Sequence, residues 1–457
     1  MNAPASHLHA LKLSELIGSF SYALDITEGQ PPGHCLRCCW IGMHIGRQAG
    51  LSETQLWELY YTLLLKDLGC SSNAARICEL YLTDDLNFKS DWMLVGDSLP
   101  QVLGFVLKHT GLKAGLAERF RKVMTILREG PTYAQELVAT RCQRGAEIAR
   151  LLRFPQGVAD GIYSLDEHFN GGGKPAQLAG EAIPIYSRIA LMAQVIDVFH
   201  TASGRAAALK EVRTRAGQWF DPRLVEAFEA VAPSDAFWTV LAGDQVERAV
   251  ADLQPAGHGQ ESPLDDDYLD DIAAAFGQVV DAKSPYTSGH SARVALYTDM
   301  IGESLGLSEP RRRWLKRGAL LHDVGKLGVS NSVLDKAGAL DRDEWDAVKQ
   351  HAAFTETILG RIGAFRELAA IAGAHHERLD GTGYPRGLSA DDIRIETRII
   401  TTADIFDAIT AARPYRGAIP IPQALEMMGK TVGSALDPDC YAALVRAVEQ
   451  VPFPQAA

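Results

Sequence analysis

Hydrophobic residues recur along this chain at intervals of three and four positions. Two of the clearest stripes are formed by Leu269, Ile272, Ala273, Phe276, Val279 and Val280 and by Val294, Tyr297, Ile301 and Leu305. That spacing places the apolar side chains on one face of an α-helix. The alternation of apolar and polar residues that marks a half-buried strand is scarce. The pattern therefore predicts an all-α protein built from helical bundles.

The chain also contains a long internal repeat. From His34 it reads HCLRCCWIGMHIGRQAGLSETQLWELYYTLLLKDLG, and from His290 it reads HSARVALYTDMIGESLGLSEPRRRWLKRGALLHDVG. These segments match without a gap at a constant difference of 256 residues (290 minus 34). Further along, Asp197 matches Asp407, and the difference has become 210 (407 minus 197). The first copy therefore carries 46 extra residues (256 minus 210), which lie at about 82–130.

A repeat of this length predicts two whole domains in tandem rather than a short-period solenoid. We expect the first domain at residues 1–250 and the second at residues 264–457. The stretch between them, 251–263, is rich in Pro, Gly and acidic residues, which is typical of a linker.

The second copy holds seven side chains of the kinds that bind transition metals. They are His290, His322, Asp323, His351, His375, His376 and Asp404. Imidazole ligands suit Fe, Mn, Zn or Ni, and seven ligands exceed the four of a closed zinc site. One carboxylate able to bridge indicates two ions. Such a pair, about 3.5–4 Å apart, can clamp a phosphate and hold a bridging hydroxide in line for attack.

Two motifs in this set resemble signatures of a known family. His322-Asp323-Val324-Gly325-Lys326 resembles the HD signature of metal-dependent phosphohydrolases, and HHERLDGTGYP at 375–385 resembles the extended GYP signature. With the segments Phe406-Asp407-Ala408 and Arg413-Pro414-Tyr415-Arg416, the chain is similar to bacterial HD-GYP domains along nearly all of residues 264–450.

The resemblance implies a role for each residue. One metal would be held by His290, His322, Asp323 and Asp404, and Asp323 would bridge to a second held by His351, His375 and His376. It also implies iron or manganese as the metal, with Asp323 and Lys326 as catalytic residues. Contacts to the substrate phosphate would come from Lys326, Arg413 and Arg416. Some family members place a third-metal glutamate where this chain has Tyr286, so we expect a two-metal site.

The implied activity is hydrolysis of a cyclic dinucleotide, with cyclic di-GMP as the first expectation and 3',3'-cyclic GMP-AMP as the alternative. Two other functions stay open at this point. A di-iron oxygenase can use a similar set of ligands, and a sensor can bind a cyclic dinucleotide without hydrolysing it.

The first copy lacks most of the ligand set. His34 and Asp67 remain, whereas the positions of His322, Lys326, His351, His375, His376 and Asp404 hold Lys66, Cys70, Arg141, Leu165, Asp166 and Gln194. A lysine or arginine that points into a two-metal cavity would repel metals and could fill their place. We therefore expect a degenerate domain without hydrolytic activity, which could serve as a surface for a homodimer or a signalling partner.

Composition and charge narrow the possible binding partners and the cellular location of the protein. The chain has 457 residues, 47% hydrophobic and 22% charged, with a net charge of −12. This acidic balance argues against wrapping DNA or RNA, and no apolar stretch is long enough to predict a membrane span. The start lacks the pattern of a secretion signal, and seven cysteines without a disulfide-like spacing suit a reducing compartment. We therefore expect a cytoplasmic protein.

Overall fold

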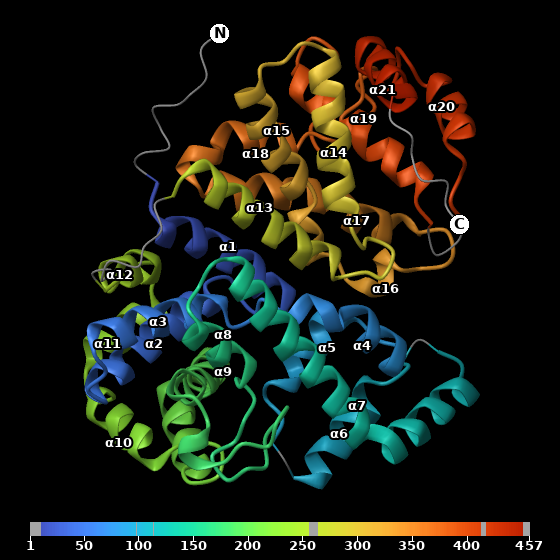
Figure 1. Cartoon of the computed structure of the whole chain (residues 1–457). Helices are drawn as coiled ribbons and strands as arrows, with labels where there is room; N and C mark the ends of the chain where they lie inside the picture. The colour runs from blue at the N-terminus through green and yellow to red at the C-terminus, as the bar shows by residue number, and fades with distance from the viewer. Residues whose placement is uncertain (1–10, 97, 113, 256–263, 413–416, 451–457) are drawn as a thin grey trace. The chain divides into compact units, whose positions relative to one another are not determined.

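The computed structural model describes residues 11–96, 98–112, 114–255, 264–412 and 417–450. These residues form two compact units, whose described parts are 12–255 and 264–450 (Figure 1). Within the described ranges there are helices and isolated bridges but no β-strand. The prediction of an all-α protein is confirmed. No helix in the described part of the chain has the length and apolar character needed to cross a membrane.

The N-terminal unit is built from helices of very different length. They are α1 (Leu13–Thr27), α2 (His34–Gln48), α3 (Glu53–Leu65), η2 (Cys70–Asn73), α4 (Ala74–Tyr81), α5 (Asp85–Trp92), α6 (Leu99–His109), α7 (Leu116–Leu151), α8 (Gln156–Tyr163), η3 (Gly180–Ala182), α9 (Ile185–Arg215), α10 (Pro222–Val231), α11 (Asp235–Ala242) and α12 (Val246–Asp252).

The C-terminal unit repeats the central part of this order with shorter connections. Its helices are α13 (Asp266–Asp281), α14 (His290–Ser304), α15 (Glu309–Leu321), η4 (Val324–Gly328), α16 (Asn331–Leu334), α17 (Arg342–Gly360), η5 (Gly363–Phe365), α18 (Arg366–Ala372), α19 (Ile395–Thr410), α20 (Ile421–Gly429) and α21 (Pro438–Gln450).

The repeat in the sequence is a repeat in the structure. Helices α2 and α3 begin and end 256 residues before α14 and α15, and α9 begins 210 residues before α19 (395 minus 185). Gly33 and Gly289 precede α2 and α14 with φ of 86° and 69°. A residue with a side chain rarely adopts this left-handed backbone, so glycine fixes where each helix begins.

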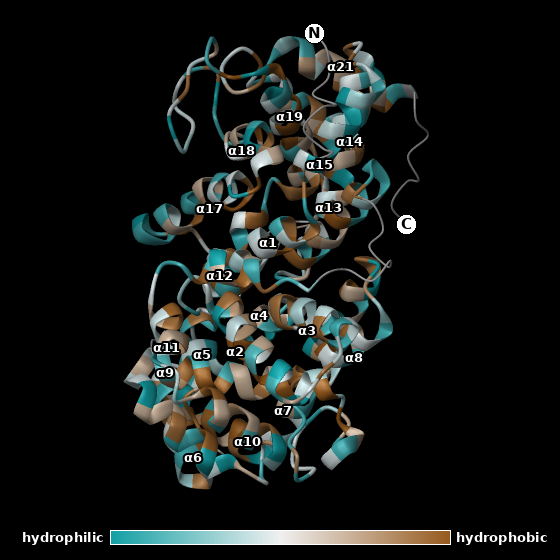
Figure 2. Cartoon of the chain, turned by 90° about the vertical axis from the view of Figure 1, so that its left-hand side faces the viewer, coloured by the Kyte–Doolittle hydropathy of each residue, from teal (hydrophilic) through white to brown (hydrophobic). Residues whose placement is uncertain are grey.

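The helices form because one face of each can be buried, and Figure 2 shows teal and brown residues on opposite faces of many of them. In the C-terminal unit, side chains of α14, α15, α19 and α21 form one apolar core, which includes Val294, Leu315, Ile400, Phe406 and Leu444. Three of these helices position candidate ligands, because α14 begins with His290, α15 directly precedes His322 and α19 contains Asp404.

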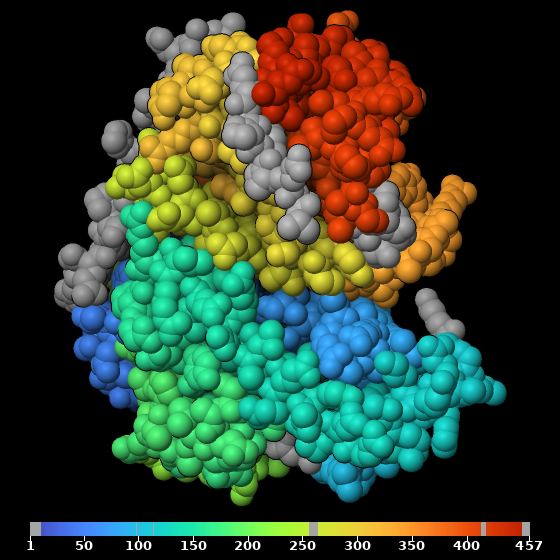
Figure 3. Space-filling model, turned by 45° about the vertical axis from the view of Figure 1, so that its right-hand side comes forward, coloured from blue at the N-terminus to red at the C-terminus, as the bar shows by residue number. Residues whose placement is uncertain are grey.

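The extra residues of the first copy form α5, α6 and the beginning of α7. Their inner faces pack into a separate small cluster with α4, which includes Ile77, Tyr81, Phe88, Phe105 and Ile126. In the space-filling view the cyan part of the chain, around residues 100–130, lies at the surface (Figure 3). The insertion is therefore a folded helical element rather than an irregular loop.

Candidate metal centre

His290 is oriented by residues outside the ligand set. It is the first residue of α14, and its Nδ1 lies 2.7 Å from Asp407 Oδ2. Arg293 holds the same carboxylate by donating from Nε to Oδ1 at 2.6 Å. Because Nδ1 is occupied in this way, Nε2 points into the centre of the unit, where it lies 3.4 Å from Asp404 Oδ1.

His322 and Asp323 follow α15 directly, and the backbone fixes both. His322 Nδ1 lies 2.6 Å from the carbonyl oxygen of Ala319, which leaves Nε2 free to face Asp323 and Asp404. Thr355 of α17 donates to the His322 carbonyl at 2.9 Å and accepts from the Gly325 amide at 3.0 Å. A Cβ on Gly325 would lie 1.9 Å from the His351 carbonyl oxygen, so only glycine lets this turn approach α17 so closely.

The other three histidines come from α17 and from the residues after α18. His351 and His375 each direct Nδ1 to a carbonyl oxygen three residues earlier, those of Val348 and Ala372. Their Nε2 atoms face each other at 3.4 Å. His376 offers a ring nitrogen within 4.8 Å of those of His351 and His375. The structure thus brings the second predicted group of ligands together.

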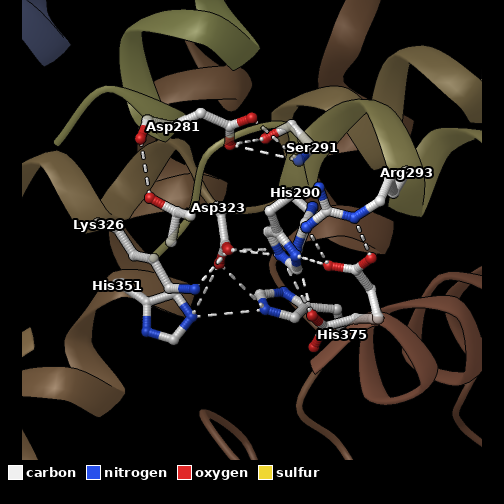
Figure 4. A network of polar contacts seen from close by, with 12 residues as sticks. Asp281, His290, Ser291, Arg293, Asp323, Lys326, His351 and His375 are labelled. Atoms are coloured by element: carbon white, nitrogen blue, oxygen red, sulfur yellow. Dashed lines mark hydrogen bonds and ion pairs between the residues drawn. The ribbon is translucent and has the colours of Figure 1, made fainter. Parts of the chain in front are cut away.

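Asp323 lies between the two groups (Figure 4). Its Oδ2 is 3.3 Å from Nε2 of both His290 and His322. Its Oδ1 is 3.5 Å from His351 Nε2 and 3.7 Å from His375 Nε2. Each oxygen therefore faces a different group of histidines, which is the arrangement that a bridging carboxylate requires.

Several atoms at this centre are buried without a hydrogen-bond partner. They are Nε2 of His290, Nε2 of His322 and Oδ1 of Asp323. Leaving such atoms unpaired costs about 1–3 kcal/mol each. Nitrogen and carboxylate donors that converge without satisfying one another fit a cation better than they fit a closed polar core.

The two groups of histidines differ in protonation. Burial lowers the pKa of His351 to about 4 and that of His376 to about 3, and it also lowers the pKa of His375. Burial acts in the same direction on His322, but the carboxylates of Asp323 and Asp404 outweigh it and raise the pKa of His322 to about 9. The neutral imidazoles of His351, His375 and His376 can bind a metal directly, whereas His322 must first lose a proton.

The predicted phosphate-binding residues are described only in part. Lys326 lies at the edge of the centre, partly exposed, and its ammonium contacts Asp323 Oδ2 (Figure 4). Arg413 and Arg416 lie outside the described residues.

Asp407 contacts the candidate ligand His290, a role that sequence reasoning missed. The signal was present, because both copies keep it together with its partners. In the first copy Asp197 lies 2.7 Å from His34 Nδ1 and accepts from Arg37 Nε at 2.6 Å. A polar triad that survives the loss of most of the ligand set suits a role in orienting the histidine.

Replacing Asp407 with asparagine should weaken metal binding and slow hydrolysis by about 10–100-fold, because the amide cannot hold His290 as the carboxylate does. Metal titration and steady-state kinetics measure this. The matched variant Asp197→Asn in the first copy should leave metal affinity unchanged. Wild-type metal affinity in Asp407→Asn would show that the contact does not orient the ligand.

The first copy carries a cation where the second copy gathers ligands. Lys66 Nζ contacts the Asp67 carboxylate, lies 3.0 Å from His34 Nε2 and donates to Gln194 Oε1 at 2.9 Å. The residues equivalent to His290, Asp323 and Asp404 thus surround an ammonium group. Nearby, Arg141 pairs with Asp166. These two residues stand at the positions of His351 and His376. Side-chain cations therefore neutralise the carboxylates at this place in the degenerate copy.

Comparisons with known proteins identify the family of the chain. The HD domain family model matches residues 114–224 and 275–440, and so reaches into both copies. The 3'3'-cGAMP-specific phosphodiesterase 3 of Vibrio cholerae is 57% identical over 440 residues, which are 96% of this chain and 95% of that protein. The crystal structure of a cyclic GMP-AMP specific phosphodiesterase of the same organism, V-cGAP3, has 52% identity and a TM-score of 0.65, covering 96% of this chain and 98% of that chain.

A second kind of relative shares only part of the chain. The cyclic di-GMP phosphodiesterase response regulator RpfG of Xanthomonas campestris is 38% identical over 178 residues, 38% of this chain and 47% of that protein. The chain therefore belongs to the HD domain family, as a cyclic-dinucleotide phosphodiesterase of the HD-GYP kind whose N-terminal copy is degenerate.

Proposed function

We propose that this protein hydrolyses 3',3'-cyclic GMP-AMP at a two-metal centre in its C-terminal unit. Sequence reasoning placed cyclic di-GMP first, but the comparisons favour the alternative. A Vibrio cholerae relative that matches nearly the whole chain is named for cyclic GMP-AMP, whereas the cyclic di-GMP enzyme RpfG matches less than half of it. The observation that carries the metal centre is the position of Asp323, with one oxygen toward each group of histidines.

The donor set fits two ions. One would be held by His290, His322 and Asp404 and the other by His351, His375 and His376, with Asp323 shared between them. Imidazoles and carboxylates together suit Fe or Mn. Metals bound there would polarise the phosphoryl oxygens and lower the pKa of a water molecule, so that it attacks phosphorus near neutral pH.

The chain's own residues position the reaction. Asp407 and Arg293 keep His290 in the tautomer that presents Nε2, and the carbonyls of Ala319, Val348 and Ala372 do the same for three other histidines. Lys326, now paired with Asp323, would turn its ammonium to the substrate phosphate as a point charge when metals neutralise that carboxylate.

The substrate is tested with the full-length protein purified anaerobically and loaded with Fe(II) or Mn(II). We expect kcat/KM for 3',3'-cyclic GMP-AMP to exceed that for cyclic di-GMP by at least about tenfold. Equal or reversed values would overturn the assignment of the substrate but not that of the metal centre. Oxygen uptake without phosphodiester cleavage would instead indicate an oxygenase, and binding without cleavage a sensor.

Metal binding should depend on pH differently at the two groups. The carboxylates of Asp323 and Asp404 raise the pKa of His290, and that of His322 to about 9, so metal binding at their group must displace protons and affinity there should rise with pH. His351 and His376 are already neutral above about pH 4, so affinity at their group should stay nearly constant between pH 6 and 8.

Calorimetric titration with Mn²⁺, in buffers of different ionisation enthalpy, measures the protons released by each ion. We expect protons to be released when one of the two ions binds, at the group of His290 and His322, and not when the other binds. Two ions that bind with the same pH dependence would contradict the difference between the groups.

A further inference from the structure

The outer face of the inserted helices carries two apolar stripes. On α6 the stripe is formed by Leu99, Leu103 and Leu107, spaced four residues apart. On α7 it is formed by Leu116, Phe120, Met124 and Leu127, spaced by four, four and three. These spacings keep each stripe on one side of its helix. The seven side chains are between 37% and 84% exposed.

The stripes do not belong to the core of their own unit. Phe105 and Ile126, on other sides of the same helices, already supply that core, and Val106 and Val123 are buried at the edge of each stripe. The cyan surface in Figure 3 contains this part of the chain. The two helices are also tied together at their junction, because Arg119 of α7 donates to the carbonyls of Leu107 and Thr110 at 2.8 and 3.1 Å. The stripes thus lie on two successive helices, α6 and α7, that hydrogen bonds join where one leads to the other.

The amount of exposed apolar surface is large for a monomer. The exposed fractions of the seven residues add up to about four fully exposed side chains. If a fully exposed apolar side chain presents about 170 Å², the stripes expose roughly 700 Å². The largest apolar patch on a typical monomer is about 300–600 Å². A stable interface of standard size buries about 800 Å² on each partner. The stripes therefore match the contribution of one partner to such an interface.

We propose that α6 and the first part of α7 pair with the same segment of a second copy of this chain, forming a four-helix bundle across a two-fold axis. Most soluble oligomers are symmetric, and in a two-fold interface each patch meets its own copy. Two hairpins that each bury one face internally and expose an apolar outer face supply the four helices and the central core of such a bundle.

The charges beside the stripes favour a protein partner over an anionic lipid surface. Lys122 donates to the carbonyl of Glu79 at 2.9 Å, Arg119 is held by backbone carbonyls, and Arg128 pairs with Glu129. These three cations are engaged within their own unit, which leaves Lys108 and Arg121 beside the stripes to reach the headgroups that binding to an anionic membrane needs.

The test is the mass of the full-length protein in solution, measured by light scattering and sedimentation at micromolar concentration. We expect about 99 kDa for the wild type, which is twice 49.6 kDa. Phe120→Glu and Leu103→Glu would each bury an uncompensated charge at the bundle and should raise the dimer Kd by at least about 100-fold. Helix content and the turnover of each chain should stay unchanged, which separates loss of pairing from misfolding.

The matched control is Leu296→Glu, which changes a leucine of similar exposure (52%) on α14 and should leave the dimer intact. A monomeric wild type, or a Phe120→Glu variant with the wild-type mass, would overturn the proposal. Binding of the wild type to phosphatidylglycerol vesicles, lost in Phe120→Glu, would overturn it in favour of a lipid surface.

Discussion

Asp323→Ala is expected to abolish hydrolysis and to reduce the affinity for both metals. This carboxylate faces both sets of histidines, so its loss removes a ligand from each ion at once. Loss of residues that only orient metal ligands costs about 10–100-fold, and loss of a shared ligand should cost more than about 100-fold in kcat/KM. Kinetics and metal analysis of the purified variant measure the two effects.

Asp346→Ala is the matched control, because it removes an exposed aspartate of the same unit, one that pairs with Lys349 on the surface of α17. It should keep full activity and metal content. If Asp323→Ala retained two tightly bound metals, Asp323 would not be the bridging ligand, whatever happened to turnover.

Lys66→Met is expected to destabilise the N-terminal unit by about 3–5 kcal/mol. The substitution leaves the buried Asp67 carboxylate without its cation, and a buried charge that loses its partner is costly. Urea unfolding followed by tryptophan fluorescence reports this, because five of the seven tryptophans lie in that unit: Trp40, Trp57, Trp92, Trp219 and Trp238.

The double variant Lys66→Met/Asp67→Asn removes both charges and should recover at least about 2 kcal/mol of the loss. If Lys66→Met left the midpoint of urea unfolding unchanged, the Lys66 ammonium would not stabilise the buried cluster of His34, Asp67 and Gln194. No recovery in the double variant would assign the loss to packing rather than to charge.

Much of this architecture could be predicted from the sequence because its signals are local or periodic. Apolar residues at helical spacing predict α13 and α14, and the constant difference of 256 residues predicts that α2 and α3 repeat as α14 and α15. The candidate ligands could be identified because histidine pairs such as His375 and His376 are rare in an apolar core.

The remaining features depend on contacts between distant residues. Asp407 lies 117 positions from His290, and nothing in its local sequence marks it as the partner of that ring. Sequence reasoning expected a cation in the cavity of the first copy, but not that Lys66 would contact His34, Asp67 and Gln194 together. The apolar stripe of the insertion could be recognised only once the structure showed which face of α6 and α7 is buried.

Anomalous diffraction from crystals of the full-length protein loaded with manganese should locate both ions. We expect two peaks, one among His290, His322 and Asp404 and one among His351, His375 and His376, with Asp323 between them and no peak beside Lys66. A single peak, or none near Asp323, would contradict the two-metal centre.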